Sequence, residues 1–370
     1  MKPRGLIVDL STINNFQNGN TLLNRIFAGM NFELQQAVRK LLSEPQKIVI
    51  IPHKNPDGDA IGSTLGLWHY LILKGHQATV VVPNDYPKFL KWMPGNEQIL
   101  NFERQNTQAR EKLTEADIIF TLDFNHLGRT GQMESILEQS TARFIMIDHH
   151  QAPADYAEFM FSDVHKSSTC EMVYDFIQLM QDGSLVNSDM ANCLYTGIMT
   201  DTGSFKYPST TSMTHRVVAD LIDKGAESTK IHHKIYDTNS PSQLHLLGCA
   251  LNNMVILEEF KTAYITLSQE ELDTFKHEKG DTEGFVNYGL TLDGIIFAVI
   301  FIENREEGII KISLRSVGDF SVNEFARKYF EGGGHTNAAG GKSDVSMEET
   351  INRFLKYLEE NRATLSAISG

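Results

Sequence analysis

Cysteine, long apolar runs and clustered positive charge are all scarce in this chain, and each scarcity excludes a class of protein. The three cysteines, Cys170, Cys193 and Cys249, are too few and too scattered for a disulfide framework or a thiolate zinc site, which favours a reducing compartment. No stretch approaches the roughly 18 apolar residues that span a bilayer, and the N-terminus has no apolar segment typical of a secretory signal. These absences predict a cytoplasmic protein without a membrane partner.

The charge balance excludes a further class of partner. The chain has 47 acidic and 33 basic residues, which gives a formal net charge of −14. Proteins that hold long DNA or RNA through counterion release carry a basic face or stripe, whereas lysine and arginine are dispersed here. We therefore expect a small phosphorylated substrate and no long duplex nucleic acid, with bound metal ions reversing the sign of the charge locally.

The hydrophobic pattern divides the chain into four segments. Residues 1–30 are rich in asparagine and aperiodic, so we predict a poorly ordered or non-native extension, with Met30 as an alternative start. Residues 31–227 alternate strand-like and helix-like patterns and predict one domain. Residues 228–254 are expected to be a linker of polar turns and a connecting helix, and residues 255–370 a second, smaller domain.

Short, β-branched apolar runs alternate with amphipathic helices in the first domain, which predicts an α/β fold with a doubly wound, mainly parallel sheet. The expected strands are Ile48–Ile51, Ala78–Val82, Ile118–Leu122 and Phe144–Ile147. One expected helix has Ile61, Leu65, Trp68 and Ile72 on a single face and Gly75 at its end. Another, Ser168–Met180, begins with Ser168 and Glu171 in capping-box spacing. The other expected helices are Phe32–Leu42, Asp189–Met199 and Ser212–Asp223. In the second domain, also α/β, we expect strands Ala263–Leu267, Ile295–Ile302 and Ile309–Leu314 and a terminal helix Met347–Asn361.

Acidic and histidine side chains recur where apolar strands end or helices begin or end. They form four clusters along the chain: His53, Asp57 and Asp59; Asp123; Asp148, His149 and His150; and Asp201. A lone aspartate at such a place is usually a cap or turn residue. However, the carboxyl ends of parallel strands meet at one edge of a sheet. Four clusters that all lie at such ends or at helix termini therefore predict a dinuclear metal site. Hard oxygen ligands mixed with imidazole suit Mn²⁺ or Mg²⁺.

A second signal is the glycine-rich segment Gly332–Gly341. Glycine lets the backbone approach a ligand closely and offers unshielded N–H groups to an anion, and the Ala-Ala-Gly step after His335 suggests a helix start that favours phosphate. Arg315, at the end of a predicted strand, could direct its guanidinium at the same anion. Taken alone, the glycines could form a flexible loop and the arginine could be structural.

These motifs together resemble the DHH phosphoesterase superfamily, which is named for the triplet seen here as Asp148-His149-His150. Within it, the chain is similar to the bacterial oligoribonucleases that are also 3′-phosphoadenosine 5′-phosphate phosphatases, the nanoRNases. The resemblance covers residues 32–361 and includes a C-terminal DHH-associated domain, whose Gly-Gly-Gly-His motif is Gly332–His335.

The resemblance implies two divalent ions, Mn²⁺ or alternatively Mg²⁺. The ligands carried over are His53, Asp57 and Asp123 for one ion, and Asp59, Asp123, His149 and Asp201 for the other, with Asp123 bridging. It implies that His150 contacts the scissile phosphate or protonates the leaving oxygen, and that Asp148 orients an adjacent histidine. The implied substrate contacts are Arg315, Gly333, Gly334 and His335, from a second domain that closes the cleft, and Arg129.

The activity that the resemblance implies is hydrolysis by a metal-activated water. The substrates would be oligoribonucleotides of about two to five nucleotides, a length limit set by a capped cleft, and 3′-phosphoadenosine 5′-phosphate, which would yield AMP. One alternative is hydrolysis of a cyclic dinucleotide or of its linear, pApA-like product. An alternative of another class is a non-catalytic nucleotide-binding regulator. The resemblance is also the sole basis for expecting a homodimer.

Overall fold

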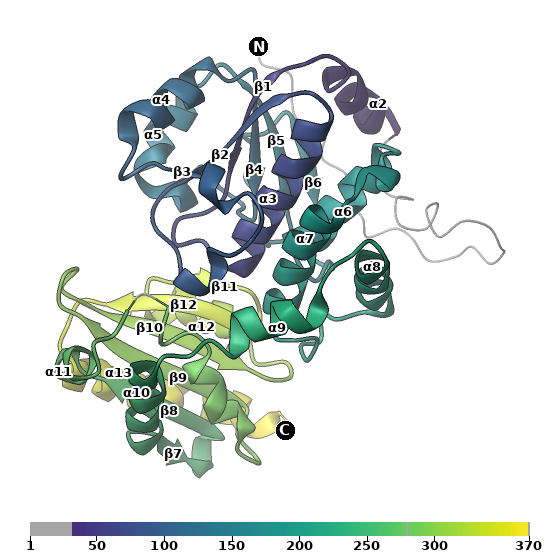
Figure 1. Ribbon diagram of the computed structural model, residues 1–370. Helices are drawn as coiled ribbons and strands as arrows, with labels where there is room; N and C mark the ends of the chain where they lie inside the picture. Colours follow the sequence, from purple (N-terminus) through teal and green to yellow (C-terminus); the bar gives the residue numbers. More distant parts are fainter. Residues whose placement is uncertain (1–31, 279, 369–370) are drawn as a thin grey trace. The chain divides into compact units, whose positions relative to one another are not determined.

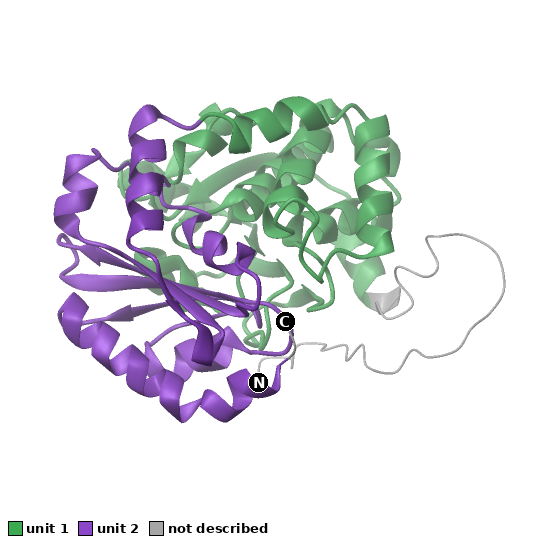
Figure 2. Cartoon of the chain, turned by 90° about the horizontal axis from the view of Figure 1, so that it is seen from below, with its two compact units in different colours: residues 1–238 green, residues 239–370 purple. Residues whose placement is uncertain are grey.

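The computed structural model describes residues 32–278 and 280–368. It divides into two compact units, the first ending at Thr238 and the second beginning at Asn239 (Figure 2). The extension predicted for residues 1–30 lies outside the described residues. The predicted linker, 228–254, contains two helices, α9 (Ser228–Tyr236) in unit 1 and α10 (Pro241–Asn252) in unit 2, and the boundary between the units falls between them.

Unit 1 is built on a six-stranded sheet in which every neighbouring pair is parallel, which confirms the predicted architecture. The strand order is β3-β2-β1-β4-β5-β6. The strands are β1 (Lys47–Ile51), β2 (Gln77–Val82), β3 (Leu100–Asn101), β4 (Ile118–Leu122), β5 (Arg143–Asp148) and β6 (Phe159–Ser162). The sequence pattern did not predict β3 and β6, since both are short strands at the edges of the sheet.

Helices cover both faces of this sheet (Figure 1). They are α2 (Phe32–Leu41), α3 (Gly58–Leu73), α4 (Asn106–Glu115), α5 (Glu134–Glu138), α6 (Thr169–Leu179), α7 (Ser188–Asp201) and α8 (Ser212–Asp223), with short 3₁₀ turns at Lys88–Leu90, Asn96–Gln98, Leu127–Met133 and Gly183–Leu185. Alternate residues of β1 feed two cores: Ile48 and Ile50 pack with α3, α6 and α7, and Val49 and Ile51 pack with α4 and α5. Two-sided burial explains why these strands are continuously apolar.

Helix α3 differs from the prediction in the face that it buries. Ile61 and Leu65 are fully buried as expected, but Ile72 is 42% exposed. The first turns of α3 are buried all round because α7 packs closely against them: a Cβ atom at Gly62 would overlap the carbonyl oxygen of Cys193. Gly75, at φ +85°, follows the end of the helix as predicted.

Unit 2 contains a mixed six-stranded sheet in the order β11-β12-β10-β9-β8-β7, with β8 and β9 parallel and the other pairs antiparallel. Its strands are β7 (Val255–Leu257), β8 (Thr262–Leu267), β9 (Phe297–Asn304), β10 (Ile309–Ser316), β11 (Gly333–Gly334) and β12 (Ala338–Ser343). Its other helices are α11 (Gln269–Thr274), α12 (Val322–Tyr329), α13 (Met347–Glu360) and α14 (Arg362–Ala367), with 3₁₀ turns at Glu258–Phe260 and Phe285–Thr291. Aromatic rings dominate its core, with Phe354 packed against both Phe297 and Phe301.

The expected helix start after His335 is wrong, because residues 338–343 form strand β12. The glycines before it serve a hairpin: a Cβ atom at Gly332 would overlap the carbonyl oxygen of Gly340, and one at Gly334 would overlap that of Ala338. Only glycine therefore allows β11 and β12 to approach this closely. Among the described residues, no helix has both the length and the apolar character needed to cross a bilayer.

Candidate metal centre

The predicted ligands lie at the carboxyl ends of three strands that are neighbours in the sheet, β1, β4 and β5. The strand order reverses direction beside β1, since the chain first adds β2 and β3 on one side and then β4, β5 and β6 on the other. In doubly wound sheets the crevice at such a switch point is where ligands bind. A fourth contribution comes from Asp201, the last residue of α7.

The turn after β1 is held in shape by an asparagine from the neighbouring strand connection. Asn55 has a left-handed backbone, with φ +57°. Its N–H donates to Asn84 Oδ1 at 2.7 Å, and Asn84 Nδ2 donates to Asn55 Oδ1 at 2.7 Å. Asp57 then caps α3, since its Oδ1 accepts from two backbone N–H groups of the first turn at 3.1 Å. The turn is therefore fixed before any ion binds.

His53 faces the carboxylates with one defined nitrogen. Its Nδ1 lies 2.8 Å from the carbonyl oxygen of Lys54. A carbonyl can only accept, so Nδ1 carries the proton and donates it. The other nitrogen, Nε2, lies 3.4 Å from Asp123 Oδ2 and 3.8 Å from Asp57 Oδ2. His53, Asp57 and Asp123 each offer a ligand atom within 4.8 Å of the others.

Asp59 is buried and is held by the N-terminus of α6. Its Oδ2 accepts from the N–H of Thr169 at 2.6 Å and its Oδ1 from the N–H of Cys170 at 2.8 Å. Helix N-termini favour an anion in this position. The helix α7 passes so close that a Cβ atom at Gly197 would lie 2.8 Å from Asp59 Oδ1 and would overlap Cys170 Sγ.

Asp123 occupies the centre of the cluster. Its backbone is left-handed, with φ +65°, a conformation that aspartate tolerates better than most residues. Its two oxygens face different partners: Oδ2 lies 3.4 Å from His53 Nε2, and Oδ1 lies 3.6 Å from His149 Nε2 and accepts from Thr169 Oγ1 at 3.1 Å. A carboxylate with one oxygen on each side has the geometry expected of a bridge.

His149 gathers the second set of carboxylates. Its Nε2 lies 3.5 Å from Asp201 Oδ2, 3.6 Å from Asp123 Oδ1 and 3.9 Å from Asp59 Oδ2. Its Nδ1 lies 3.2 Å from the carbonyl oxygen of Lys166, to which it donates. The structure thus directs the same nitrogen, Nε2, of both His53 and His149 at carboxylates.

Asp148 contacts His150 rather than His149. His150 Nδ1 donates to Asp148 Oδ1 at 2.8 Å and lies 3.6 Å from Asp123 Oδ1. Asp148 is fully buried, and its Oδ2 has no hydrogen-bond partner among the described residues. The structure therefore places Asp148 where it can orient the ring of His150.

The electrostatics of the cluster show the effect of crowding buried carboxylates together. Burial and the charges of Asp123 and Asp201 hold the pKa of Asp59 well above its usual value. Burial, with only part of its effect offset by His149, raises the pKa of Asp201 to about 7. For Asp123, burial is outweighed by attraction to His149 and His53, which lowers its pKa well below 3.8. Buried acids of this kind are stabilised by binding either protons or a metal ion, so the donor set fits divalent cations.

Two of the predicted phosphate contacts lie at one end of the sheet in unit 2. Arg315 pairs with Ala338 across β10 and β12, and the N–H of His335 donates to the carbonyl oxygen of Ala338 at 2.7 Å. The glycine N–H groups are engaged inside the unit: that of Gly334 donates to Asn323 Oδ1 at 2.9 Å, and that of Gly332 to the carbonyl oxygen of Ala326 at 3.2 Å. The expected anion contact from those two N–H groups is therefore replaced by a structural role.

Arg129, the remaining predicted contact, lies beside the turn after β1. Its carbonyl oxygen accepts from the N–H of Lys54 at 2.7 Å. Burial and the charge of Arg129 both act to lower the pKa of His53, but the hydrogen bond to Asp123 and the charges of Asp57 and Asp123 outweigh them and raise it. Sequence analysis did not predict Asn84 or Lys166 as supports of the site. Neither residue belongs to a recognisable motif, and only the tertiary fold brings them to Asn55 and His149.

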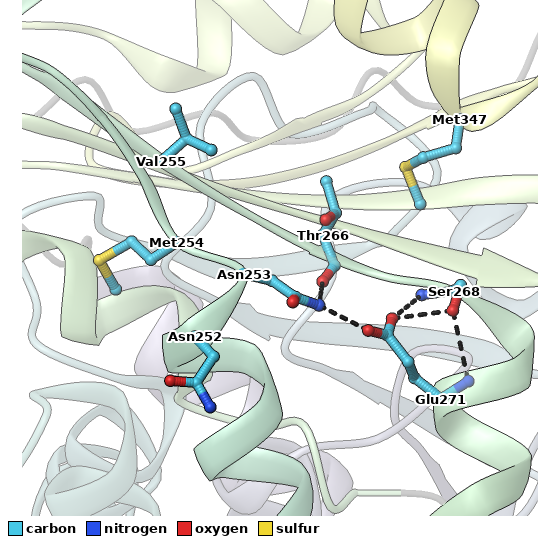
Figure 3. A pocket seen from close by; sticks show the side chains of 8 residues that line it. All are labelled: Asn252, Asn253, Met254, Val255, Thr266, Ser268, Glu271 and Met347. Atoms are coloured by element: carbon cyan, nitrogen blue, oxygen red, sulfur yellow. Dashed lines mark hydrogen bonds between the residues drawn. The ribbon is translucent and has the colours of Figure 1, made fainter.

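Unit 2 also has a pocket of about 520 Å³ that the sequence did not predict (Figure 3). Its polar floor is Glu271, which accepts from Ser268 N and Oγ at 2.8 Å each and from Asn253 Nδ2 at 2.8 Å. Ser268 and Glu271 form the capping box of α11. These bonds satisfy the carboxylate within the fold, so we interpret this pocket as structural.

Both units match domains of known protein families. Residues 47–198 match the model of the DHH family, N-terminal domain, and residues 265–363 match the DHHA1 domain. The chain is 30% identical to the bifunctional oligoribonuclease and PAP phosphatase NrnA of Thermus thermophilus over 315 residues, covering 85% of this chain and 89% of that protein. It is 24% identical to the cyclic-di-AMP phosphodiesterase GdpP of Geobacillus thermodenitrificans, of which the match covers 49%.

A solved structure is also similar over nearly the whole chain. An exopolyphosphatase-related protein from Bacteroides fragilis is 42% identical, with a TM-score of 0.87, covering 91% of this chain and 98% of that one. The matched domains include every predicted metal ligand from His53 to His149, but not Asp201, and they include the Gly-Gly-Gly-His motif. The chain therefore belongs to the DHH family of phosphoesterases.

Proposed function

We propose that this protein is a metal-dependent phosphoesterase that hydrolyses short oligoribonucleotides to mononucleotides and converts 3′-phosphoadenosine 5′-phosphate to AMP. The observation that carries the proposal is the arrangement of two ligand sets around the two oxygens of Asp123. Similarity to a bifunctional oligoribonuclease and PAP phosphatase over 85% of the chain supports this choice of substrates.

Six residues would hold two divalent ions, Mn²⁺ or Mg²⁺, with Asp123 shared by both. One set is His53, Asp57 and Asp123, and the other is Asp59, Asp123, His149 and Asp201. When bound, such ions supply Lewis-acid stabilisation of the phosphoryl charge and lower the pKa of a nearby water. The protein's part is to keep both imidazole Nε2 atoms turned inward, which the carbonyl groups of Lys54 and Lys166 achieve.

His150 is our candidate for the proton donor. Because Asp148 accepts from Nδ1, it orients the ring of His150. When Nε2 carries a proton, it can donate that proton to the leaving oxygen or to a phosphoryl oxygen. Asp148 is buried and already oriented, so the ring needs no rearrangement for either task.

Unit 2 would bind the substrate's phosphate through side chains. Arg315 offers a planar guanidinium that suits a phosphate, and His335 occupies the tight turn between β11 and β12. Gly333 and Gly334 contribute through their small size, which leaves room beside these side chains. Arg129 of unit 1 would be a further phosphate contact. We also include a cytoplasmic location and a homodimer in the proposal.

The direct test is a substrate panel assayed with purified protein and Mn²⁺. The panel contains RNAs from two to twenty-four nucleotides, 3′-phosphoadenosine 5′-phosphate, pApA and cyclic di-AMP. We expect turnover of the shortest RNAs and of the bisphosphate, with kcat/KM falling as the RNA lengthens. Turnover of long RNA alone, or of none of these compounds, would contradict the proposal.

A second candidate is a dinucleotide phosphodiesterase, since GdpP-type proteins of related sequence are named for cyclic di-AMP. The chain spans about half the length of that relative. In the same panel, cyclic di-AMP or pApA would then be the preferred substrate. A non-catalytic regulator would instead bind the nucleotides without turnover, which the intact ligand sets disfavour.

A further inference from the structure

A buried charged cluster lies behind His149, on the side away from the carboxylates. It consists of Lys166, Glu171 and Asp175, which we call the Lys166 cluster. Lys166 Nζ lies 3.2 Å from Glu171 Oε1 and 2.5 Å from Asp175 Oδ2. Glu171 is 1% exposed and Asp175 is 3% exposed. The two carboxylates lie four residues apart on α6, so they share one face of that helix.

Glu171 connects three parts of unit 1. Its Oε2 accepts from Ser167 Oγ at 2.5 Å and from Thr214 Oγ1 at 3.0 Å, while Oε1 accepts from Lys166 Nζ. Ser167 and Lys166 belong to the segment before α6, and Thr214 belongs to the first turn of α8. One carboxylate thus fixes the segment before α6 and links it to two helices.

The peptide group between Lys166 and Ser167 is the link to the metal centre. Its carbonyl oxygen accepts from His149 Nδ1 at 3.2 Å. The side chains on both sides of this peptide, those of Lys166 and Ser167, bind the same carboxylate of Glu171. Movement of the carbonyl group therefore requires at least one of these bonds to break.

Stability alone is a poor reason for such a cluster. A buried ion pair often contributes no more to stability than an apolar group of the same volume, and here two carboxylates share one lysine. The cost is visible at Asp175, where burial outweighs attraction to Lys166 and raises the pKa to about 6. Buried polar networks of this kind, when satisfied, do rigidify the groups that they contact.

We propose that Glu171 is a positioning residue of the metal centre. Acting through Lys166 and Ser167, it fixes the carbonyl group that holds His149 Nδ1. The imidazole ring is thereby held in one orientation, and Nε2 stays directed at Asp59, Asp123 and Asp201. This inference rests on the proposed function in one respect, namely that His149 is a metal ligand. It adds a residue that makes no contact with the ion itself.

The test compares Glu171→Gln with a matched control. Glu171→Gln keeps the shape of the side chain and replaces an acceptor by a donor that faces Lys166, Ser167 or Thr214. The control is Tyr174→Phe, which removes the 2.7 Å hydrogen bond from Tyr174 Oη to Asp220 Oδ2. That bond also joins α6 to α8, but it does not involve the segment before α6. The control therefore measures the effect of loosening this helix contact alone.

The first readout is Mn²⁺ affinity, measured by calorimetry on the metal-free protein. Loss of a group that supports a metal ligand typically weakens binding about 10- to 100-fold, and we expect a loss in this range for Glu171→Gln. Tyr174→Phe should bind Mn²⁺ within about 2-fold of the wild type, a change of about 0.4 kcal/mol. In activity assays, kcat of Glu171→Gln should recover as Mn²⁺ is raised to saturation.

The second readout needs no metal or substrate. The ¹H–¹⁵N NMR spectra of the metal-free protein report the hydrogen bond from His149 Nδ1–H to the carbonyl oxygen of Lys166. We expect an Nδ1–H signal protected from exchange with water in the wild type and in Tyr174→Phe, and a weakened or broadened signal in Glu171→Gln. If Glu171→Gln does not fold, Ser167→Ala removes a single donor to Glu171 and should give the same changes at smaller size. Lys166→Arg should retain more Mn²⁺ affinity than Lys166→Met.

The outcomes separate this inference from the proposed function. If the wild type binds no Mn²⁺, the proposed function fails. If the wild type binds Mn²⁺ and Glu171→Gln binds it equally well with an unchanged Nδ1–H signal of His149, the positioning role of Glu171 is refuted and the metal centre stands.

Discussion

Gly197 offers a sharp test of how closely α7 approaches the metal centre. In Gly197→Ala, the new Cβ atom would overlap Cys170 Sγ and lie 2.8 Å from Asp59 Oδ1 and 3.0 Å from Asp59 Cα. Real Cβ contacts are essentially never that short, so Asp59, α6 or α7 must shift. The substitution therefore tests packing and ligand placement together.

The expected change in stability follows from two opposing contributions. Alanine in place of glycine inside a helix stabilises it by up to about 1 kcal/mol. Overpacking a tight core costs about 1–3 kcal/mol. The free energy of unfolding should thus fall by about 0–3 kcal/mol, which urea denaturation measures. Because Asp59 is displaced, Mn²⁺ affinity should fall more than about 10-fold, a larger effect than the stability change suggests.

Two further variants separate the contributions. Gly248 is also inside a helix, α10, but a Cβ atom there would meet nothing within 4 Å. Gly248→Ala should be as stable as the wild type or more stable, with unchanged Mn²⁺ affinity. Adding Cys170→Ala to Gly197→Ala removes the overlap with sulfur, so it should restore stability but not affinity, since the 2.8 Å approach to Asp59 remains. Wild-type stability and affinity in Gly197→Ala itself would refute the described packing.

Three more predictions follow from the site and the Lys166 cluster. Asp123→Ala should abolish Mn²⁺-dependent hydrolysis of every substrate, and retained turnover in a colorimetric phosphate or chromatographic assay would exclude a bridging role. His335→Ala should raise KM for dinucleotides while the metal content, measured by atomic emission, stays at the wild-type value; loss of metal would mean that unit 2 supports the metal centre. The pKa of Asp175 is raised from 3.8 to about 6. Between these pH values the folded state binds a proton that the unfolded state has released. The free energy of unfolding therefore falls as pH rises through this range, by up to about 3 kcal/mol. Asp175→Asn cannot titrate and so does not lose stability in this way. Urea denaturation at pH 4.5 and pH 7 should therefore show that the free energy of unfolding of the variant, relative to that of the wild type, is higher at pH 7. The same difference at both pH values would contradict the burial of the charge.

The main strands could be predicted because each is a short apolar run buried on both faces. Ile118–Leu122 was predicted with the bounds that the structure shows. Strands β1 and β2 begin one residue earlier than predicted, and β5 is one residue longer at each end. Once the strands are parallel, their carboxyl ends share an edge. The approach of Asp123 to His53 and His149 followed from that geometry.

Contacts that depend on tertiary packing could not be predicted in this way. Asn84 and Asn55 are 29 residues apart, and Lys166 and His149 are 17 apart, with no periodicity that links them. The half-formed capping box of α6 shows the same limit. Ser168 caps the helix as predicted, but Glu171 binds Ser167, Lys166 and Thr214 instead of returning to the cap. The capping motif was therefore predicted at the right position, but neighbouring side chains give Glu171 a different role.

The central claim is that two cations bind on either side of Asp123. Anomalous diffraction at the manganese edge, from crystals soaked in Mn²⁺, tests it most directly. We expect two peaks in unit 1, one contacting His53 and Asp57, the other contacting His149 and Asp201, and both contacting Asp123. A single peak remote from Asp123, or none at saturating Mn²⁺, would contradict the claim.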